Sequence, residues 1–472
     1  MARSGRSPRA PLPPNTKMEK VLDYNNRSSD NLNSDRLNSN SRRSNGRRIA
    51  TWSVRFLIIA VALLLLGSGA AERDAHRSDV LTFLGDRFVS PDTLPSDSFI
   101  VALDRRTTNP NAAKYSIILR GVDPVERALF QDARSGNWER FDLFRAAMIA
   151  EGIRDIERIR AYEARIDALV ARVMASGHTT PQALTRALFE AMHRELLTRP
   201  YSLHCTELSK VMDTGHFNCV SATILFNCLA EKAGLDVIGL EIPGYDETPG
   251  HVLSRVRFRD GTYTNIETTA PTWFAMQSEQ ERQQATLERI APMPAVPNPL
   301  TAQNAVPAIP EPAVDVMANH RKVNQVQLVA MIYYNRGVDL LAKKQHAEAA
   351  AAKVKALHLD QDSEKAWANL LVSINNWAVL DAAPRGKEGR RHYDVATFLL
   401  DQGMALDPTF EKFPPNYVFI FHDWMGDLTR LGRFEDARRV FAFAQERVPN
   451  NANLLKLLDY VNSEERRIMQ QR

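Results

Sequence analysis

Cysteine is scarce in this sequence, and signatures of bound metals or nucleotides are missing from it. The 472 residues include only three cysteines, Cys205, Cys219 and Cys228, too few for a disulfide framework. The sequence has no paired Cys-x-x-Cys or His-x-x-x-His spacing typical of metal sites and no glycine-rich loop typical of phosphate binding. It also has no segment that resembles a nucleic-acid-binding motif. We therefore expect neither a cofactor or metal nor a nucleic-acid partner.

Long hydrophobic runs are also rare, and the one that is present follows a basic tail. Residues 1–48 carry eleven Arg or Lys against four Asp or Glu and contain almost no aliphatic run, so we expect this tail to be disordered. The next segment, 49–71, includes sixteen uncharged residues from Phe56 to Ala71, a length between that of the hydrophobic region of a signal peptide and that of a full membrane span. Arginines precede it without acidic residues close by, whereas mixed charges follow it. This predicts a single-pass anchor with a cytoplasmic N-terminus and the remaining domains outside the cytoplasm, or a signal peptide cleaved after Ala71.

Residues 123–290 show a helical pattern first and a strand pattern afterwards. Apolar residues from Trp138 to Val173 recur every three or four positions, which predicts one long helix or two helices broken near Gly152. Thr180 and Pro181 predict the start of another helix, and Asn218 is the predicted N-cap of a helix that ends before Gly234. Three predicted strands follow, at 236–242, 251–258 and 262–268. This order of helices and then strands favours an α+β fold over a doubly wound sheet. Residues 72–122, which precede this region, give no clear pattern and are left as a linker or unassigned.

The C-terminal third contains an internal repeat after a proline-rich segment. Residues 291–322 hold a run of prolines without helical or strand periodicity, which predicts an extended linker. In residues 323–472, small and large residues recur at a spacing of about 34 residues, as expected of paired helices that approach closely. The pattern resembles the tetratricopeptide (TPR) repeat family, which implies a groove for a protein partner; a generic helical bundle is the alternative. Three copies carry the pattern: Tyr333, Gly337, Leu340, Ala349 and Ala356; Trp367, Leu370, Ala396, Leu400 and Gly403; Phe421, Leu428, Gly432, Ala437, Phe441 and Ala444.

Three residues in the α+β region have the side chains of a thiol acyl-transfer site. Cys219 follows the predicted N-cap, where the positive end of the helix and its free N–H groups would favour a thiolate and could receive an oxyanion. His251 and Glu267 lie on predicted strands, and supply a base and a group that orients it. His216, next to Cys219, is a rival base. A zinc site of Cys205, His216 and Cys219 and a Cys205–Cys219 disulfide are competing interpretations of the cysteine.

The turn between the two strands decides whether His251 and Glu267 can meet. A two-residue turn at Asp260-Gly261 would point Glu267 away from His251. A three-residue loop with Gly261 in a left-handed bulge would pair Phe258 with Thr262, making His251 and Glu267 diagonal neighbours on one face. The other face would then be buried, as in a half-buried hairpin. We predict the three-residue loop.

These motifs together resemble the transglutaminase-like, papain-related family. The matching segments are Asn218-Cys219-Val220-Ser221-Ala222, Gly250-His251-Val252 and Asn265-Ile266-Glu267-Thr268-Thr269. The segments Ala146–Glu151 and Tyr162–Leu169 resemble the bacterial branch that joins this core to TPR repeats. The resemblance implies Cys219 as nucleophile, His251 as base and later acid, and Glu267 as orienting carboxylate. The family usually has aspartate at the last position, so the longer Glu267 predicts a shifted geometry.

The resemblance and the motifs lead to two expectations about function. The first is a membrane-anchored thiol enzyme that hydrolyses a peptide or isopeptide bond, or transfers an acyl group from glutamine to an amine. Its substrate would be a protein or peptide, and the repeats would bind a protein partner. The alternative is a catalytically inactive scaffold in which the repeats gather partners.

Overall fold

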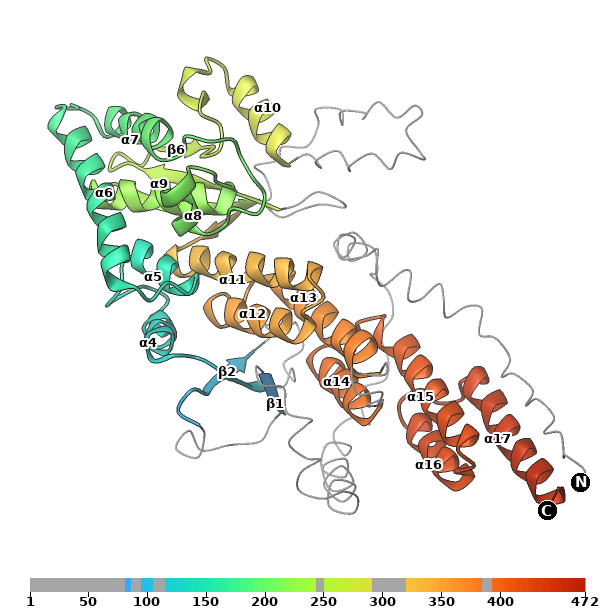
Figure 1. Cartoon of the computed structure of the whole chain (residues 1–472). Helices are drawn as coiled ribbons and strands as arrows, with labels where there is room; N and C mark the ends of the chain where they lie inside the picture. The colour runs from blue at the N-terminus through green and yellow to red at the C-terminus, as the bar shows by residue number, and fades with distance from the viewer. Residues whose placement is uncertain are drawn as a thin grey trace, which may run out of the picture. The chain divides into compact units, whose positions relative to one another are not determined.

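The fold is known from a computed structural model that describes residues 81–85, 95–104, 115–242, 250–290, 320–383 and 393–471 (Figure 1). Within these ranges the chain forms fourteen α-helices and two small antiparallel sheets, which confirms the predicted α+β class. The described residues between 81 and 410 form one compact unit, and the described part of the other unit is 411–471. The predicted tail and membrane anchor lie outside the described residues. No helix within the described ranges is long and apolar enough to cross a bilayer.

Residues 72–122, left unassigned from the sequence, contain a three-stranded sheet. Its strands are β1 (Leu81–Gly85), β2 (Phe99–Leu103) and β3 (Tyr115–Leu119), in the spatial order β1-β3-β2. The side chain of Gln361, far along the chain, closes the outer edge of β2. It donates a hydrogen bond to the carbonyl of Ala102 (3.1 Å) and accepts one from the amide of Asp104 (3.3 Å). This edge is therefore satisfied by the helical region rather than by another strand.

The helices that precede the second sheet match the sequence pattern closely. After α4 (Pro124–Asp132), the chain breaks at Gly152 into α5 (Leu143–Ala150) and α6 (Ile156–Ala175), which confirms the two-helix alternative. Helix α7 (Pro181–Glu195) begins as predicted, with the Thr180 hydroxyl accepting from the amide of Ala183 at 3.1 Å. A short helix, α8 (Leu208–Thr214), was not predicted.

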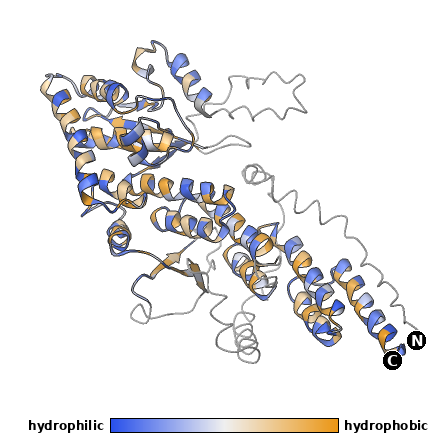
Figure 2. Ribbon diagram, viewed as in Figure 1, coloured by the Kyte–Doolittle hydropathy of each residue, from blue (hydrophilic) through white to orange (hydrophobic). Residues whose placement is uncertain are grey.

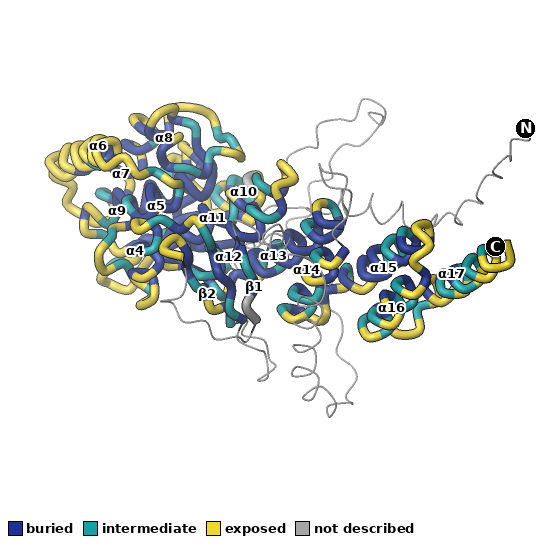
Figure 3. The backbone as a smooth tube through the Cα atoms, turned by 60° about the horizontal axis from the view of Figure 1, so that its bottom comes forward, coloured by how far each residue is buried: buried dark blue, intermediate teal, exposed yellow. Residues whose placement is uncertain are grey.

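The predicted helix at Cys219 and the three strands after it are all present. Helix α9 (Cys219–Lys232) is followed by β4 (Asp236–Ile242), β5 (His251–Arg257) and β6 (Tyr263–Ile266), and then by helix α10 (Glu279–Ile290). Together with a later strand, β7 (Arg321–Val323), these strands form an antiparallel sheet in the order β6-β5-β4-β7. Helix α9 is buried along almost its whole length, in contrast to the exposed α6 (Figure 3).

The register of the β5–β6 hairpin confirms the three-residue loop. Ser254 pairs with Ile266, and the Phe258 amide donates to the Thr262 carbonyl at 2.8 Å. Gly261 has φ +84, the left-handed conformation that this bulge requires. The expectation of a half-buried hairpin was wrong, because every residue of β5 except Arg257 is buried. Both faces of this strand are covered by other parts of the unit.

The end of the predicted proline-rich linker belongs to the sheet. Strand β7 (Arg321–Val323) pairs antiparallel with β4, so that Val323 lies opposite Gly239. Arg321 and Lys322 therefore extend the sheet by one strand, although the sequence placed them in the linker. The part of the predicted linker that precedes residue 320 lies outside the described residues.

The first helices of the region predicted to hold repeats pack against the α+β core instead of forming a separate body. Helices α11 (Gln325–Ala342) and α12 (His346–Leu359) form a hairpin, followed by α13 (Glu364–Asn376), the π-helical segment η5 (Trp377–Ala382) and α14 (Tyr393–Leu406). From α11, the Tyr333 hydroxyl donates to Glu126 at 2.8 Å, and from α12, Lys355 pairs with the same carboxylate at 2.9 Å. Residues 320–410 thus belong to the same compact unit as the sheet.

Gly337 lies where α11 and α12 approach most closely, and its substitution tests this contact. A Cβ atom there would lie 2.8 Å from Cε of the buried Lys353 and 3.2 Å from the Ala349 carbonyl. Although alanine favours helices, we expect Gly337→Ala to destabilise the unit by about 1–3 kcal/mol through overpacking. Thermal unfolding measures this, with the exposed Val338→Ala as control. A raised melting temperature for Gly337→Ala would contradict the close approach.

The C-terminal unit consists of three helices in its described part. These are α15 (Phe413–Arg430), α16 (Phe434–Gln445) and α17 (Ala452–Gln470). Hydrophilic and hydrophobic residues alternate along all three (Figure 2), and the buried set includes Phe421 and Leu454. The pattern is that of amphipathic helices packed on one another.

Candidate active site

Cys219 is the first residue of α9, and a capping box fixes the start of this helix. The Asn218 side chain accepts a hydrogen bond from the Ser221 amide (3.1 Å), and the Ser221 hydroxyl accepts one from the Asn218 amide (3.0 Å). The side-chain amide of Asn218 also donates a hydrogen bond to the Thr206 hydroxyl at 2.7 Å, which fixes the orientation of this capping side chain. These bonds fix the backbone on both sides of Cys219 and thereby the position of its sulfur, independently of the contacts that the sulfur itself makes.

His251 and Glu267 meet directly, as the hairpin register requires. Nε2 of His251 lies 2.7 Å from Oε2 of Glu267, and both side chains are buried, with residue exposures of 3% and 0%. The other carboxylate oxygen accepts from the Thr269 amide (3.1 Å) and hydroxyl (2.7 Å). Both oxygens of Glu267 thus have partners, and the longer side chain reaches the imidazole without loss of the hydrogen bond.

The imidazole of His251 also forms a side-chain hydrogen bond with Cys219. Because Nε2 is engaged by Glu267, Nδ1 is the ring nitrogen left for the thiol. The structure therefore brings the three residues singled out in the sequence into one chain of contacts, thiol to imidazole to carboxylate. The geometry is that of a nucleophile, a base and a group that orients the base.

The electrostatics of this chain favour a thiolate paired with an imidazolium. Burial alone raises the pKa of the Cys219 thiol, but the hydrogen bond and charge of His251 outweigh it and hold the pKa below its usual value. Burial lowers the pKa of His251, but the charge of Glu267 and the bond to Cys219 raise it to about 10. Burial raises the pKa of Glu267, but the positive charge of His251 and its hydrogen bond outweigh this and keep the pKa below its ordinary value.

The sulfur has two further neighbours that sequence reasoning missed. The backbone amide of Val252 donates a hydrogen bond to it. The Tyr201 hydroxyl is hydrogen-bonded to both the side chain and the backbone amide of Cys219, and burial together with the negative charge of Cys219 raises its pKa above the usual value. Tyr201 is brought to Cys219 by an isolated β-bridge with Phe217, and a single bridge of this kind leaves no periodic signal in the sequence.

The N–H groups at the start of α9 contribute less than we expected. The Ser221 amide is taken by Asn218, and the Cys219 amide is bonded to the Tyr201 hydroxyl. The donors to the sulfur are instead His251, the Val252 amide and the Tyr201 hydroxyl. An oxyanion could accept a hydrogen bond from the Cys219 amide only if the Tyr201 hydroxyl moves. That hydroxyl could either leave the site or rotate to donate a second hydrogen bond to the oxyanion.

The competing interpretations of the cysteines do not hold. All three cysteines are free thiols, so no Cys205–Cys219 disulfide forms. In the described ranges no three His, Cys, Asp or Glu side chains converge as metal ligands, which includes Cys205, His216 and Cys219. The rival base His216 contacts the Pro200 carbonyl through Nδ1 at 2.9 Å. Cys228 is buried, and burial raises its pKa well above the usual value, consistent with a packing role.

Comparisons of the chain with known protein families, with curated proteins and with solved structures find no match. The functional argument therefore depends on the geometry of the site and on the sequence motifs.

Proposed function

We propose that Cys219, His251 and Glu267 are the catalytic residues of a transglutaminase-like thiol enzyme, whose α+β core is joined to TPR-like helical repeats. The observation that carries this proposal is the buried 2.7 Å bond between His251 and Glu267, on an imidazole that is also bonded to Cys219. A buried charge pair aligned on a thiol at a helix start is the arrangement that thiol acyl transfer requires.

In the proposed reaction, the Cys219 thiolate attacks the carbonyl carbon of an amide and a C–S bond forms. The carbonyl oxygen becomes an oxyanion beside the Cys219 amide and the Tyr201 hydroxyl. When the intermediate collapses, the C–N bond breaks and the leaving amine takes the proton held by His251. His251 then accepts a proton from water or from an incoming amine, which attacks the thioester. The products are an acid or a new amide, and the free thiol is restored.

The proposal includes the location and partners expected from the sequence. The core would lie outside the cytoplasm, held by the segment at 49–71, and would act on a protein or peptide. The helical repeats would bind a second protein. Support for these statements comes from the sequence pattern alone.

The proposal is tested by selective alkylation of Cys219. Cys205 is half-buried, so the experiment uses the full chain with Cys205→Ala. Iodoacetamide at pH 7 should modify Cys219, and mass spectrometry should find no modification in the matched Cys219→Ala variant. The buried Cys228 is the internal control and should react only after denaturation. An unmodified Cys219 in the folded protein would count against an enzyme.

One observation favours the inactive scaffold instead. Cys219 is only 9% exposed, so a substrate carbonyl has little direct access to the sulfur in this conformation. If Cys219 resists alkylation while Cys219→Ala and His251→Ala leave the cellular phenotype unchanged, the scaffold is the better description.

A further inference from the structure

We propose that Lys365, on the repeat helix α13, recognises a carboxylate of the acyl donor, close to the carbonyl that Cys219 attacks. This inference rests on the proposed function and adds a substrate class to it. It arises from a cluster of charged residues between the sheet and the helices that follow β7, at the end of the sheet where Cys219 also lies.

Hydrogen bonds between α9 and the sheet place this cluster near Cys219. The Thr223 hydroxyl donates to the Val252 carbonyl (3.1 Å), and one turn further along the helix Asn227 accepts from Ser254 (2.7 Å). Cys219 precedes Thr223 by one turn and so lies beyond Val252, at the end of β5 where His251 lies. Glu241 of β4 is paired with Val252. Its carboxylate therefore lies at the same end of the sheet as the sulfur.

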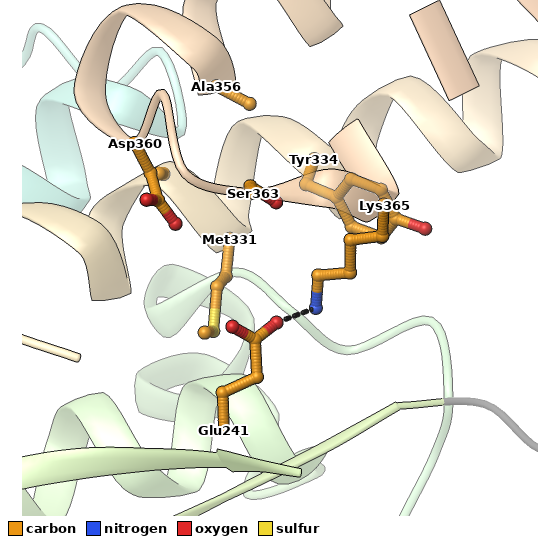
Figure 4. Close-up of a pocket in the computed structure, with 8 residues that line it drawn as sticks. Glu241, Met331, Tyr334, Ala356, Asp360, Ser363 and Lys365 are labelled. Atoms are coloured by element: carbon orange, nitrogen blue, oxygen red, sulfur yellow. Dashed lines mark ion pairs between the residues drawn. The ribbon is translucent and has the colours of Figure 1, made fainter. Parts of the chain in front are cut away.

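Lys365 reaches Glu241 from the repeat helices (Figure 4). Its ammonium group is 2.5 Å from Oε1 of Glu241, and Oε2 of the same carboxylate is 2.8 Å from Nε of Arg321. Arg321 in turn bonds to Asp360 at 2.9 Å. Two carboxylates and two cations thus form a balanced network at the junction of β4, β7 and the repeats.

Lys365 is the member of this network that can leave it at the lowest cost. The side chain of Glu241 is only 7% exposed, and a buried carboxylate left unpaired would be strongly destabilising. Glu241 keeps Arg321 as a partner when Lys365 moves, whereas Arg321 binds two carboxylates at once. The side chain of Lys365 is 25% exposed, so its ammonium group can turn toward solvent.

The surroundings of Lys365 suit a cation that exchanges partners. The Tyr334 ring lies 4.8 Å from its ammonium group, a contact that stabilises a cation without neutralising it. The adjoining cavity has a volume of only about 10 Å³, room for about one water, so the substrate carboxylate would be met at the exposed side of Lys365. Burial alone lowers the pKa of Lys365, but the negative charge of Glu241, with a smaller contribution from Cys219, raises it.

The test compares two alkylating probes with the same reactive group but different charge. Iodoacetate carries a carboxylate and iodoacetamide does not, so the ratio of their rates at Cys219 measures attraction of a carboxylate to the site. All variants are made in the full chain with Cys205→Ala. We expect Lys365→Met to lower the iodoacetate-to-iodoacetamide ratio by about fivefold, because a positive charge is lost and Glu241 is exposed. Glu241→Gln should raise the ratio, and Lys365→Arg should keep it near that of the parent.

The control Lys322→Met removes a charge from an exposed position on β7 and should leave the ratio unchanged. Absence of modification at the buried Cys228 shows that each variant is folded. If the ratio is the same in the parent, Lys365→Met and Glu241→Gln while iodoacetamide still modifies Cys219, the carboxylate proposal is wrong and the thiol enzyme stands. If iodoacetamide does not modify Cys219 in the parent protein, the proposed function itself fails.

Discussion

A His251→Ala variant is expected to lose the reactive thiolate at Cys219. In the folded protein the imidazole lowers the pKa of the thiol, and without it burial alone would raise that pKa above its usual value. The variant thiol should therefore remain protonated at pH 7, and its alkylation rate should fall by about a hundredfold. The rate of modification by iodoacetamide between pH 5 and 10, in the Cys205→Ala background, measures this.

The sign of the pH dependence follows from the two shifts. The pKa of Cys219 is lowered and that of His251 is raised to about 10. The wild-type thiolate should thus persist as an ion pair to lower pH than an ordinary thiolate, and the pair should be lost as the imidazolium deprotonates near pH 10. His193→Ala is a suitable control. This imidazole contacts the Thr268 carbonyl at 3.0 Å and burial lowers its pKa to about 4, so it is neutral at pH 7. An equal loss of reactivity in both variants would indicate a general structural effect.

A Glu267→Ala variant is expected to be the least stable of the single substitutions. It removes the carboxylate partner of a fully buried imidazolium, and breaking such a pair costs about 3–5 kcal/mol. Urea unfolding at pH 7 should show this loss. Glu267→Gln, which keeps the shape and can still accept a hydrogen bond, should lose less, and equal stability of Glu267→Ala and wild type would contradict the buried pair.

The stability contributed by the pair of His251 and Glu267 should be lost at both low and high pH. The pKa of His251 is raised in the folded state from 6.5 to about 10, so its contribution is fully present below about pH 6.5 and is lost as pH rises toward 10. The pKa of Glu267 is lowered, so its contribution is present above about pH 4.5 and is lost at lower pH. In Glu267→Ala the difference from wild type should therefore shrink at both extremes.

Local sequence signals were enough to predict the elements that carry the proposed site. Asn218 marked the start of α9, and the choice of a three-residue loop at Gly261 correctly paired the hairpin strands. These features depend on residues near in sequence, whose conformational preferences act locally. The contact between His251 and Glu267 followed from that register.

The features that the sequence did not indicate depend on distant contacts. The pattern of 72–122 was unclear because β2 is completed by the side chain of Gln361, which lies far along the chain. Tyr201 reaches Cys219 from an isolated β-bridge with Phe217, and Lys365 reaches Glu241 from helix α13. The π-helical segment η5 also has no signal in the repeat spacing. Such contacts are set by tertiary packing and leave no periodic pattern.

The pairing of β7 with β4 determines where this protein can be cut. A truncation after residue 322, at the apparent end of the proline-rich segment, would remove Val323 and α11. The pairing of β4 with β7 would then be reduced to Arg321 and Lys322 without the helix that follows them, and Glu126 would lose Tyr333 and Lys355 as partners. Such a shortened protein is expected to aggregate, so a lost phenotype would say nothing about partner binding. A cut after Phe410 leaves the larger compact unit intact and removes only α15 to α17.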